Sequence, residues 1–459
     1  MIAWVLFLIY AVATAALALI AGRGTDSARG FAIGSGKMSP LVVGITLGAT
    51  LASAATFVLY PGFVYADGLA ALIGFSIPLI SGLAIGLFVF APRFQAIGAP
   101  ADALTVPHWL GARYGDFGLR RLFALLQVLN VAYLVLIVVG CGYVVEASLG
   151  VSYPQAIVGI TLFVFGYTAL GGATAHAFTN TLQGLMMLVV SVAVFLSGLH
   201  TWPETWASLR DSGFVAPEGL IYRTPFEVLG VPFFIGIALT TQPHLLSKAL
   251  YVKGARALRT TLSIGLGTYA TYALMLSAGA YARVLLPAGI PQDRVVAEYL
   301  QIAFSWPPIG AAISVAILAA SMSTMDGLLV AIAASIGNDV IPGRGTVWLN
   351  RLVLAGLAIG TLALAWSPPA AVLLLGQLGV YGLATASVGP LVAGLGTTRP
   401  LQSWPAWLAT LVPLAIHLGL ALTIVDNPGI SAILGMAVGV PLGLIAWVLP
   451  PPRLKAGSA

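Results

Sequence analysis

Long apolar stretches of near 20 residues, separated by short polar connections, follow one another along the chain. Helices of this length span the apolar core of a bilayer, whereas membrane-barrel strands are shorter and alternate. A window of about 19 residues predicts about 13 spans and hence an all-α membrane protein with a single transmembrane domain over residues 1–459. The spans lie near residues 2–22, 40–65, 69–91, 120–147, 154–171, 178–200, 226–250, 258–286, 309–336, 347–367, 369–395, 404–425 and 429–449.

The composition agrees with a lipid environment. Of the 459 residues, 59% are hydrophobic and 7% are charged, whereas soluble chains carry roughly 25% charged residues. A soluble globular fold is therefore excluded, and the single cysteine, Cys141, excludes a disulfide framework. The net charge of +6 is scattered over short loops, which argues against a nucleic-acid partner. No obligatory protein partner is evident from the sequence.

The basic residues predict an orientation in the membrane. If the N-terminus lies outside, sixteen of the 20 Lys and Arg residues fall in inner connections, and only Arg210, Arg223, Arg283 and Arg294 fall outside. By the positive-inside bias, we expect a multi-pass protein of the cell (inner) membrane with an outer N-terminus and a cytoplasmic C-terminus. The longest outer connection, 201–225, is expected to form a short interfacial segment.

The ten central spans divide into two groups of five, 40–200 and 226–396, whose first members cross the bilayer in opposite directions. This arrangement is typical of an inverted repeat. The first span of each group contains helix breakers, namely Pro61 and Gly62 after the small residues 52–56, and Pro232 and Pro243. Proline removes a backbone donor and frees carbonyl groups, so we predict two broken helices. Glycine and proline are also common in ordinary membrane helices, which stays open as an alternative.

A run of polar residues interrupts the span 309–336, within the segment ILAASMSTMDGLL. Ala320, Ser323 and Thr324 are spaced by three and four residues and so share one helical face. Hydroxyl and carbonyl oxygens are suitable ligands for a hard monovalent cation, and the carbonyls of Ala49 and Ala52 on the broken second span could complete the set. A Ser-Thr pair of this kind also occurs as a simple helix-packing feature.

Asp326 lies three residues beyond Ser323 in the same span. An intramembrane carboxylate is costly and is rarely found without a partner or a role. Asp326 is therefore a candidate for a second cation site or a proton site. The structural alternative is a buried hydrogen bond to a neighbouring amide or hydroxyl.

Other polar residues give weaker signals. His244 could sense protons, although a hydrogen bond to a carbonyl group is the simpler interpretation, and His176 is expected to be solvated at the inner mouth. Gln127, Asn130 and Tyr133 fit either a gate or pocket, or a polar stripe that joins two helices.

Five blocks of the sequence together resemble the solute:sodium symporter family, over nearly the whole chain. They are LASAATFVLYPGFVYADG in the first core helix, VPHWLGARYGD in an inner loop, ALGGATAHAFTNTLQGLMMLV in the fifth core helix, QPHLLSKAL, and AASMSTMDGLL. The resemblance implies a leucine-transporter-type fold with a 5+5 inverted-repeat core, one extra N-terminal helix and two extra C-terminal helices. It also implies sodium-driven uptake of a small organic solute by alternating access.

Carried over position by position, the resemblance implies a Na⁺ site and a solute pocket. The family's Na⁺ ligands map onto the carbonyl groups of Ala49, Ala52 and Ala320 and the hydroxyls of Ser323 and Thr324. The adjacent solute pocket maps onto Thr56, Phe57 and Tyr60 and, more loosely, onto Thr241, Gln242, Gln377 and Tyr381.

One departure affects the ion stoichiometry. Many family members carry an acidic residue where this chain has Asn180, within Thr-Asn-Thr-Leu-Gln. The carboxylate that would serve a second sodium ion is thus missing there, and Asp326 could substitute for it from the facing helix. We hypothesise one sodium site and leave open whether Asn180 and Asp326 form a second.

The remaining alternatives concern function and substrate. An intramembrane enzyme would need a metal cluster, a nucleophile with a base, or paired carboxylates, and no such motif occurs, so no enzymatic activity is expected. A transporter-like sensor would need a signalling segment, and none is expected after residues 450–459. No Lys or Arg is expected near the mid-membrane pocket, and the blocks look nearest to the pantothenate, short-chain monocarboxylate and proline branches. We therefore expect a small organic acid, with a proline-like amino acid or proton coupling through Asp326 as alternatives.

Overall fold

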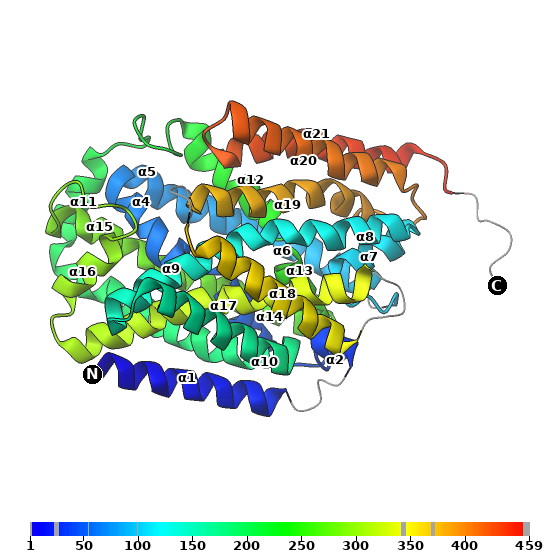
Figure 1. The fold of residues 1–459 in the computed structure, drawn as a ribbon. Coiled ribbons are helices and arrows are strands. Elements are labelled where there is room, and N and C mark those ends of the chain that lie inside the picture. The colour runs from blue at the N-terminus through cyan, green and yellow to red at the C-terminus, as the bar shows by residue number, and fades with distance from the viewer. Residues whose placement is uncertain are drawn as a thin grey trace.

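The computed structural model describes residues 2–22, 27–53, 55–98, 100–340, 346–368 and 372–452. All regular elements among these residues are helices, which run side by side as a bundle with α1 at one edge and α20 and α21 at the opposite edge (Figure 1). Ala54, in the predicted interruption of the second span, lies outside the described residues. The same holds for four of the predicted inner charges, Arg23, Arg344, Arg453 and Lys455.

The first half of the chain ends with a helix on the predicted outer connection. Its α-helices are α1 (Ile2–Ala21), α2 (Ala28–Ile33), α3 (Pro40–Leu51), α4 (Tyr60–Asp67), α5 (Leu69–Phe75), α6 (Ile77–Gly98), α7 (Val106–Tyr114), α8 (Phe117–Leu126), α9 (Val131–Leu149), α10 (Tyr153–Ser197) and α11 (Trp202–Asp211). A π-helical stretch, η1 (Ala55–Leu59), precedes α4, and 3₁₀ turns η2 (Gln127–Asn130) and η3 (Leu199–Thr201) join α8 to α9 and α10 to α11.

The second half begins with another π-helical stretch, η4 (Phe226–Gly230). Its α-helices are α12 (Val231–Leu239), α13 (Pro243–Leu246), α14 (Ala255–Tyr272), α15 (Leu276–Leu285), α16 (Val295–Ala303), α17 (Pro307–Asp339), α18 (Val347–Ala365), α19 (Val372–Leu395), α20 (Trp404–Thr423) and α21 (Pro428–Val448). The 3₁₀ turns η5 (Ser247–Leu250) and η6 (Ala273–Met275) follow α13 and α14.

Among the described residues, nine helical segments are long and apolar enough to cross a membrane, or eleven if each of two bent pairs counts as one span. The predicted number of 13 is thus not confirmed. The two predicted spans 154–171 and 178–200 correspond to the two halves of the 45-residue element α10, which consists of two helices joined at a kink at Gly172 (φ 50°), although the second span extends three residues beyond it. Glycine fits this position because other residues rarely adopt a positive φ. The predicted span 258–286 is divided between α14 and α15 by η6.

Both predicted helix interruptions are present in the structure. The segment Pro40–Leu51 meets Ala55–Asp67 at a bend of 58°, and Phe226–Leu239 meets Pro243–Leu250 at a bend of 61°. The first bend precedes Pro61, which lies in the first turn of α4, and the second directly precedes Pro243, which opens α13. Pro232 instead lies inside the segment Phe226–Leu239, at the start of α12 and directly after η4, and does not coincide with the bend.

Helix α17 forms the centre of the bundle. All residues in the apolar stretch of α17 that could cross a membrane are buried (100%), against 17% of the residues in the corresponding stretches of α1 and α18. A helix that is apolar all round is expected to be enclosed by other helices, and α17 packs against α10, α9, α1, α3 and α18. Its few polar side chains, including Ser323, Thr324 and Asp326, are therefore held against neighbouring helices and away from lipid.

Candidate functional site

The break between α3 and α4 lies against the polar face of α17. The Ser323 hydroxyl is 2.9 Å from the Ala49 carbonyl oxygen and 2.6 Å from the Ala320 carbonyl oxygen, and it donates to these two oxygens. The Thr324 hydroxyl donates to the carbonyl of Thr50 over 3.2 Å. The end of α3 and the middle of α17 are thus joined by hydroxyl-to-carbonyl contacts, although their residues are about 270 positions apart in the chain.

This oxygen set fits a hard cation. Of the five residues predicted to bind sodium, Ala49, Ala320 and Ser323 converge directly, and Thr324 reaches the same stretch of α3 through Thr50. Ala52 is fully buried and caps the C-terminal end of α3, with its N–H bonded to the Gly48 carbonyl. Among the described residues, no group of three or more His, Cys, Asp or Glu side chains could hold a metal ion, and neutral oxygens of this kind suit Na⁺ better than a transition metal.

Asn180 on α10 completes the polar layer around these groups. Its amide Nδ2 donates to the Thr50 hydroxyl over 2.9 Å and to the Ser323 carbonyl over 3.1 Å. Its Oδ1 atom is buried and has no hydrogen-bond partner among the described residues. Asn180, where the resemblance led us to expect a carboxylate, therefore lies beside the candidate sodium ligands and presents its neutral amide nitrogen to them.

Asp326 faces α10, two residues beyond Thr324. Its carboxylate lies 2.9 Å from Nδ1 of His176 and accepts hydrogen bonds from the Tyr167 and Thr179 hydroxyls over 3.0 and 3.3 Å. All three partners belong to α10, and Asp326 is 0% exposed. His176 was expected to be solvated at the inner mouth, and this expectation is wrong because the side chain is enclosed between α10 and α17 and paired with Asp326.

Lys248 is another charged group whose position the sequence did not indicate. The positive-inside bias placed it in an inner connection, yet its side chain is only 2% exposed. Its ammonium donates to the carbonyl of His244 over 2.6 Å, one turn earlier in the same bent segment. A local hydrogen bond at the end of a broken helix therefore holds the buried amine of Lys248 in place.

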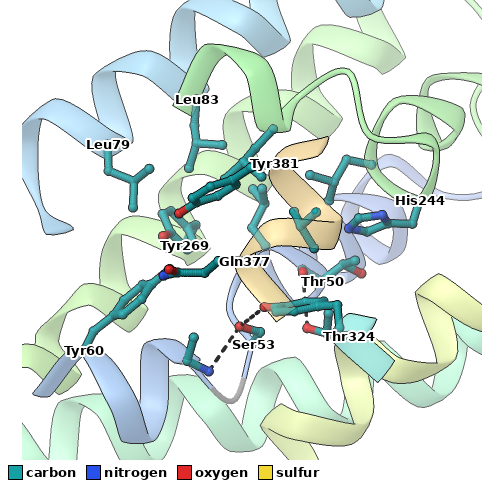
Figure 2. A pocket seen from close by; sticks show the side chains of 16 residues that line it. Thr50, Ser53, Tyr60, Leu79, Leu83, His244, Tyr269, Thr324, Gln377 and Tyr381 are labelled. Atoms are coloured by element: carbon teal, nitrogen blue, oxygen red, sulfur yellow. Dashed lines mark hydrogen bonds between the residues drawn. The ribbon is translucent and has the colours of Figure 1, made fainter. Parts of the chain in front are cut away.

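A cavity of about 70 Å³ lies between the two broken helices and α19 (Figure 2). Three of the predicted solute residues, Tyr60, Gln377 and Tyr381, line it. Thr324 and Thr50 line it as well, so one of the candidate sodium ligands, Thr324, borders the same space. The other described lining residues are Leu51, Ser53, Ala55, Leu79, Leu83, Tyr133, Leu239, His244, Leu245, Tyr269 and Val380.

Four predicted solute residues do not line this cavity. Phe57 is 0% exposed and packs on Tyr272, with ring centroids 6.0 Å apart, and Thr56 is buried. The Thr241 hydroxyl donates to the carbonyl of Ala238 over 2.7 Å. The Gln242 amide donates to the carbonyl of Val380 over 2.7 Å, so it holds the second break against α19.

Tyr133, Tyr269 and His244 are lining residues for which the sequence gave weak signals or none. The Tyr133 hydroxyl donates to Oγ of Ser53 over 2.6 Å, which connects α9 to the first break. Of the other two polar residues of the fourth span, Asn130 donates to Oε1 of Gln242 over 3.4 Å and Gln127 to its own helix. Both alternatives for this stripe are thus represented, since Tyr133 lines the cavity and Asn130 joins two elements.

A second charged network lies at the far end of α17, next to α7 and α8. The Arg120 guanidinium is 2.7 Å from Oδ1 of Asp339, which is 0% exposed, and Thr105 also donates to this carboxylate. Nearby, burial lowers the pKa of His108 below its usual value, Arg120 lowers it further, and Asp102 opposes the shift. This network ties the predicted inner loop containing α7 to the end of the central helix.

Comparisons with known proteins agree with this architecture. The family model of the sodium:solute symporter family matches residues 31–391. A sodium/proline symporter of Staphylococcus aureus is 24% identical over 388 residues, covering 80% of this chain and 75% of the relative, and that of strain Newman is 25% identical over 392 residues, covering 80% and 76%.

Solved structures share the fold. A Na⁺-coupled sialic acid symporter in a substrate-bound outward-open state superposes with a TM-score of 0.79 at 19% identity, covering 98% of both chains. A nucleobase-cation-symport-1 family transporter in a closed conformation gives 0.60 at 16% identity, covering 93% and 95%. The leucine-transporter-type fold expected from the sequence is thereby confirmed. The family match spans most of the chain and the relatives are transporters, so this protein is a multi-pass membrane transporter, not an enzyme, and belongs to the sodium:solute symporter family.

Proposed function

We propose that this protein imports a small organic acid, most simply a monocarboxylate, together with sodium by alternating access. The observation that carries the proposal is the set of oxygens contributed by Ala49, Ala320, Ser323 and Thr324, next to the cavity lined by Thr324 and Tyr60. A cation held there would stabilise both the break in the first core helix and the wall of the solute cavity.

Thr324 belongs both to the candidate sodium site and to the lining of the solute cavity, and this couples the binding of the two ligands. If sodium orders Thr324 in the position that the solute meets, then each ligand raises the affinity for the other by the same factor. One sodium ion and one monocarboxylate together carry no net charge, so the membrane potential, which acts on net charge at about 2.3 kcal/mol per charge for each 100 mV, does not drive the pair, and the inward sodium gradient favours release of the cation. The solute is then carried with it.

The lining chemistry favours an acid over an amino acid. The described lining residues offer hydroxyl, amide and imidazole groups and include no Asp or Glu to pair with an ammonium group. A sodium ion beside Thr324 would itself attract a carboxylate. The alternative, a proline-like amino acid, is favoured by the relatives, which are sodium/proline symporters at 24–25% identity.

We also propose the membrane arrangement predicted from the charges and the repeats. In this arrangement the N-terminus is outside and the C-terminus is cytoplasmic, and residues 40–200 and 226–396 form the two inverted repeats. The two bent spans support it, because they occur at the first span of each group. A second ion site at Asp326 or Asn180 stays an alternative proposal. The bonds of Asp326 to three groups of α10 argue against it.

Uptake into proteoliposomes tests the function. The purified protein is reconstituted, and uptake of labelled monocarboxylates and of proline is measured with sodium or choline outside, at two pH values. We expect sodium-dependent uptake of a monocarboxylate with a sodium Hill coefficient close to one. Sodium-independent, acid-stimulated uptake would reject sodium coupling in favour of protons, proline uptake alone would select the amino-acid alternative, and a Hill coefficient clearly above one would reject the single sodium site.

A further inference from the structure

His244 lies between two cavities. It lines the cavity described above and also a smaller one, bordered by Thr105, Tyr251 and Ser335 toward the inner ends of α7 and α17. The residue is the second of α13, directly after the bend in the second broken helix. It therefore occupies the end of the solute cavity opposite Tyr60, and the two side chains stand on opposite sides of the cavity in Figure 2.

The imidazole of His244 has unused hydrogen-bonding capacity. The side chain is 7% exposed, and its buried Nδ1 atom has no hydrogen-bond partner among the described residues. A buried polar atom without a partner costs about 1–3 kcal/mol, and native proteins contain few such atoms. Two other buried histidines of this chain, His176 and His417, each bond to a side chain through Nδ1, although Nε2 of His176 is also without a partner among the described residues. His244 differs from both because its unpartnered imidazole lines the solute cavity.

The lining of the two cavities suits an anion. The described residues that line the solute cavity include no Lys or Arg, so His244 is the one lining side chain there with an ionisable nitrogen. The buried side-chain amine of Lys248 donates to the carbonyl of His244 over 2.6 Å. The described lining of either cavity contains no carboxylate that would compete for the imidazole N–H.

We propose that His244 donates a hydrogen bond to the carboxylate of the transported solute, at the inner end of the cavity that Thr324 also lines. The inference rests on the proposed function and specifies its substrate class, a monocarboxylate with an uncharged remainder. That remainder lies toward Tyr60, Gln377 and Tyr381, which offer hydroxyl and amide groups but no negative charge for an ammonium group.

Binding to purified protein tests this assignment. Thermal stabilisation and calorimetric titration are measured in sodium chloride and in choline chloride, with propanoate, butanoate, 4-hydroxybutanoate and pentanoate as probes. The tightest-binding acid is then compared with its primary amide, which has nearly the same shape and no charge. The variants are His244→Leu, which removes the imidazole, and His244→Gln, which retains an N–H donor. His417→Gln, a buried histidine bonded to Ser431 outside both cavities, is the matched control.

In sodium, wild type is expected to bind the acid about tenfold more tightly than the amide, which corresponds to about 1.4 kcal/mol. His244→Leu should weaken acid binding about tenfold and amide binding less than twofold, His244→Gln should fall between wild type and His244→Leu, and His417→Gln should match wild type. Equal losses for acid and amide in His244→Leu would overturn the assignment, because the residue would then only shape the cavity. If His244→Leu does not fold, the same comparison in His244→Gln decides.

The test separates this inference from the proposed function. Sodium-dependent binding of an acid that does not change on substitution of His244 overturns the inference and leaves organic-acid transport standing. Failure of every acid to bind in sodium overturns the proposed function, and the assignment of His244 with it.

Discussion

The carboxylate of Asp326 and the imidazole of His176 lie 2.9 Å apart at the contact between α17 and α10, with both side chains at 1% exposure or less. Tyr167 and Thr179 complete the surroundings of the carboxylate, so each of its described partners is a donor on one neighbouring helix. The pair therefore fixes the position of the α17 helix just beyond the candidate sodium ligands.

Loss of this carboxylate should destabilise the protein. Asp326→Ala leaves the buried donors of α10 without their acceptor, and we expect the free energy of unfolding to fall by about 3 kcal/mol. Asp326→Asn keeps one acceptor oxygen and should cost less. Thermal unfolding in detergent measures both changes. Equal stability of Asp326→Ala and wild type would contradict the structural role assigned to the pair.

Removal of a candidate sodium ligand should weaken sodium binding specifically. Thr324→Ala deletes a hydroxyl that borders both the ion set and the solute cavity, and the sodium concentration for half-maximal uptake should rise about tenfold. Ser321→Ala on the same helix is the control, because its hydroxyl bonds to the Ile317 carbonyl of its own helix. An unchanged sodium dependence in Thr324→Ala at normal expression would exclude this hydroxyl as a ligand.

Periodicity and composition predicted the helical class, the two broken spans and the shared face of Ala320, Ser323 and Thr324, because each depends on local spacing. They did not predict the pairing of Asp326 with His176, since the two residues are 150 positions apart and only helix packing brings them together. Gln242 was expected in the pocket, but its amide bonds to the α19 backbone. The direction of a side chain at a helix break depends on local backbone angles that no periodic pattern encodes.

The ion pair between Arg120 and Asp339 offers a test by double substitution. Arg120→Gln leaves the fully buried carboxylate of Asp339 without its cation and should lower stability by about 3 kcal/mol. Adding Asp339→Asn removes the unpaired charge, so the double variant should regain much of this loss. Thermal unfolding of the two single variants and the double variant measures the coupling, and additive losses would contradict a direct ion pair.

His108 should make stability depend on pH. Burial, with Arg120 nearby, lowers the pKa of folded His108 below the unfolded value of about 6.5. The unfolded chain therefore binds more protons in this range, and stability is full above about pH 6.5 and falls as the pH drops toward the folded pKa. The loss of thermal midpoint between pH 8 and pH 5 should be smaller in His108→Gln than in wild type. An identical loss in both proteins would assign the effect to other groups.

The proposed orientation can be tested with single cysteines. In a Cys141→Ala background, Glu218→Cys and Lys253→Cys each place a thiol at an exposed position. A membrane-impermeant thiol reagent should label Glu218→Cys in intact cells and Lys253→Cys only after permeabilisation. The reverse pattern would invert the proposed topology.

The hydrogen bonds of Ser323 suggest how a bound ion could leave quickly. Its hydroxyl donates to the carbonyl oxygens of Ala49 and Ala320, which are the oxygens that a cation would take. An arriving ion must turn the single hydrogen of this hydroxyl aside, and after the ion departs that hydrogen is again shared between the two oxygens. Because the Ser323 hydroxyl bonds to these oxygens when the ion is absent, the difference in free energy between the ion-bound and ion-free forms is smaller. A small difference of this kind favours rapid turnover.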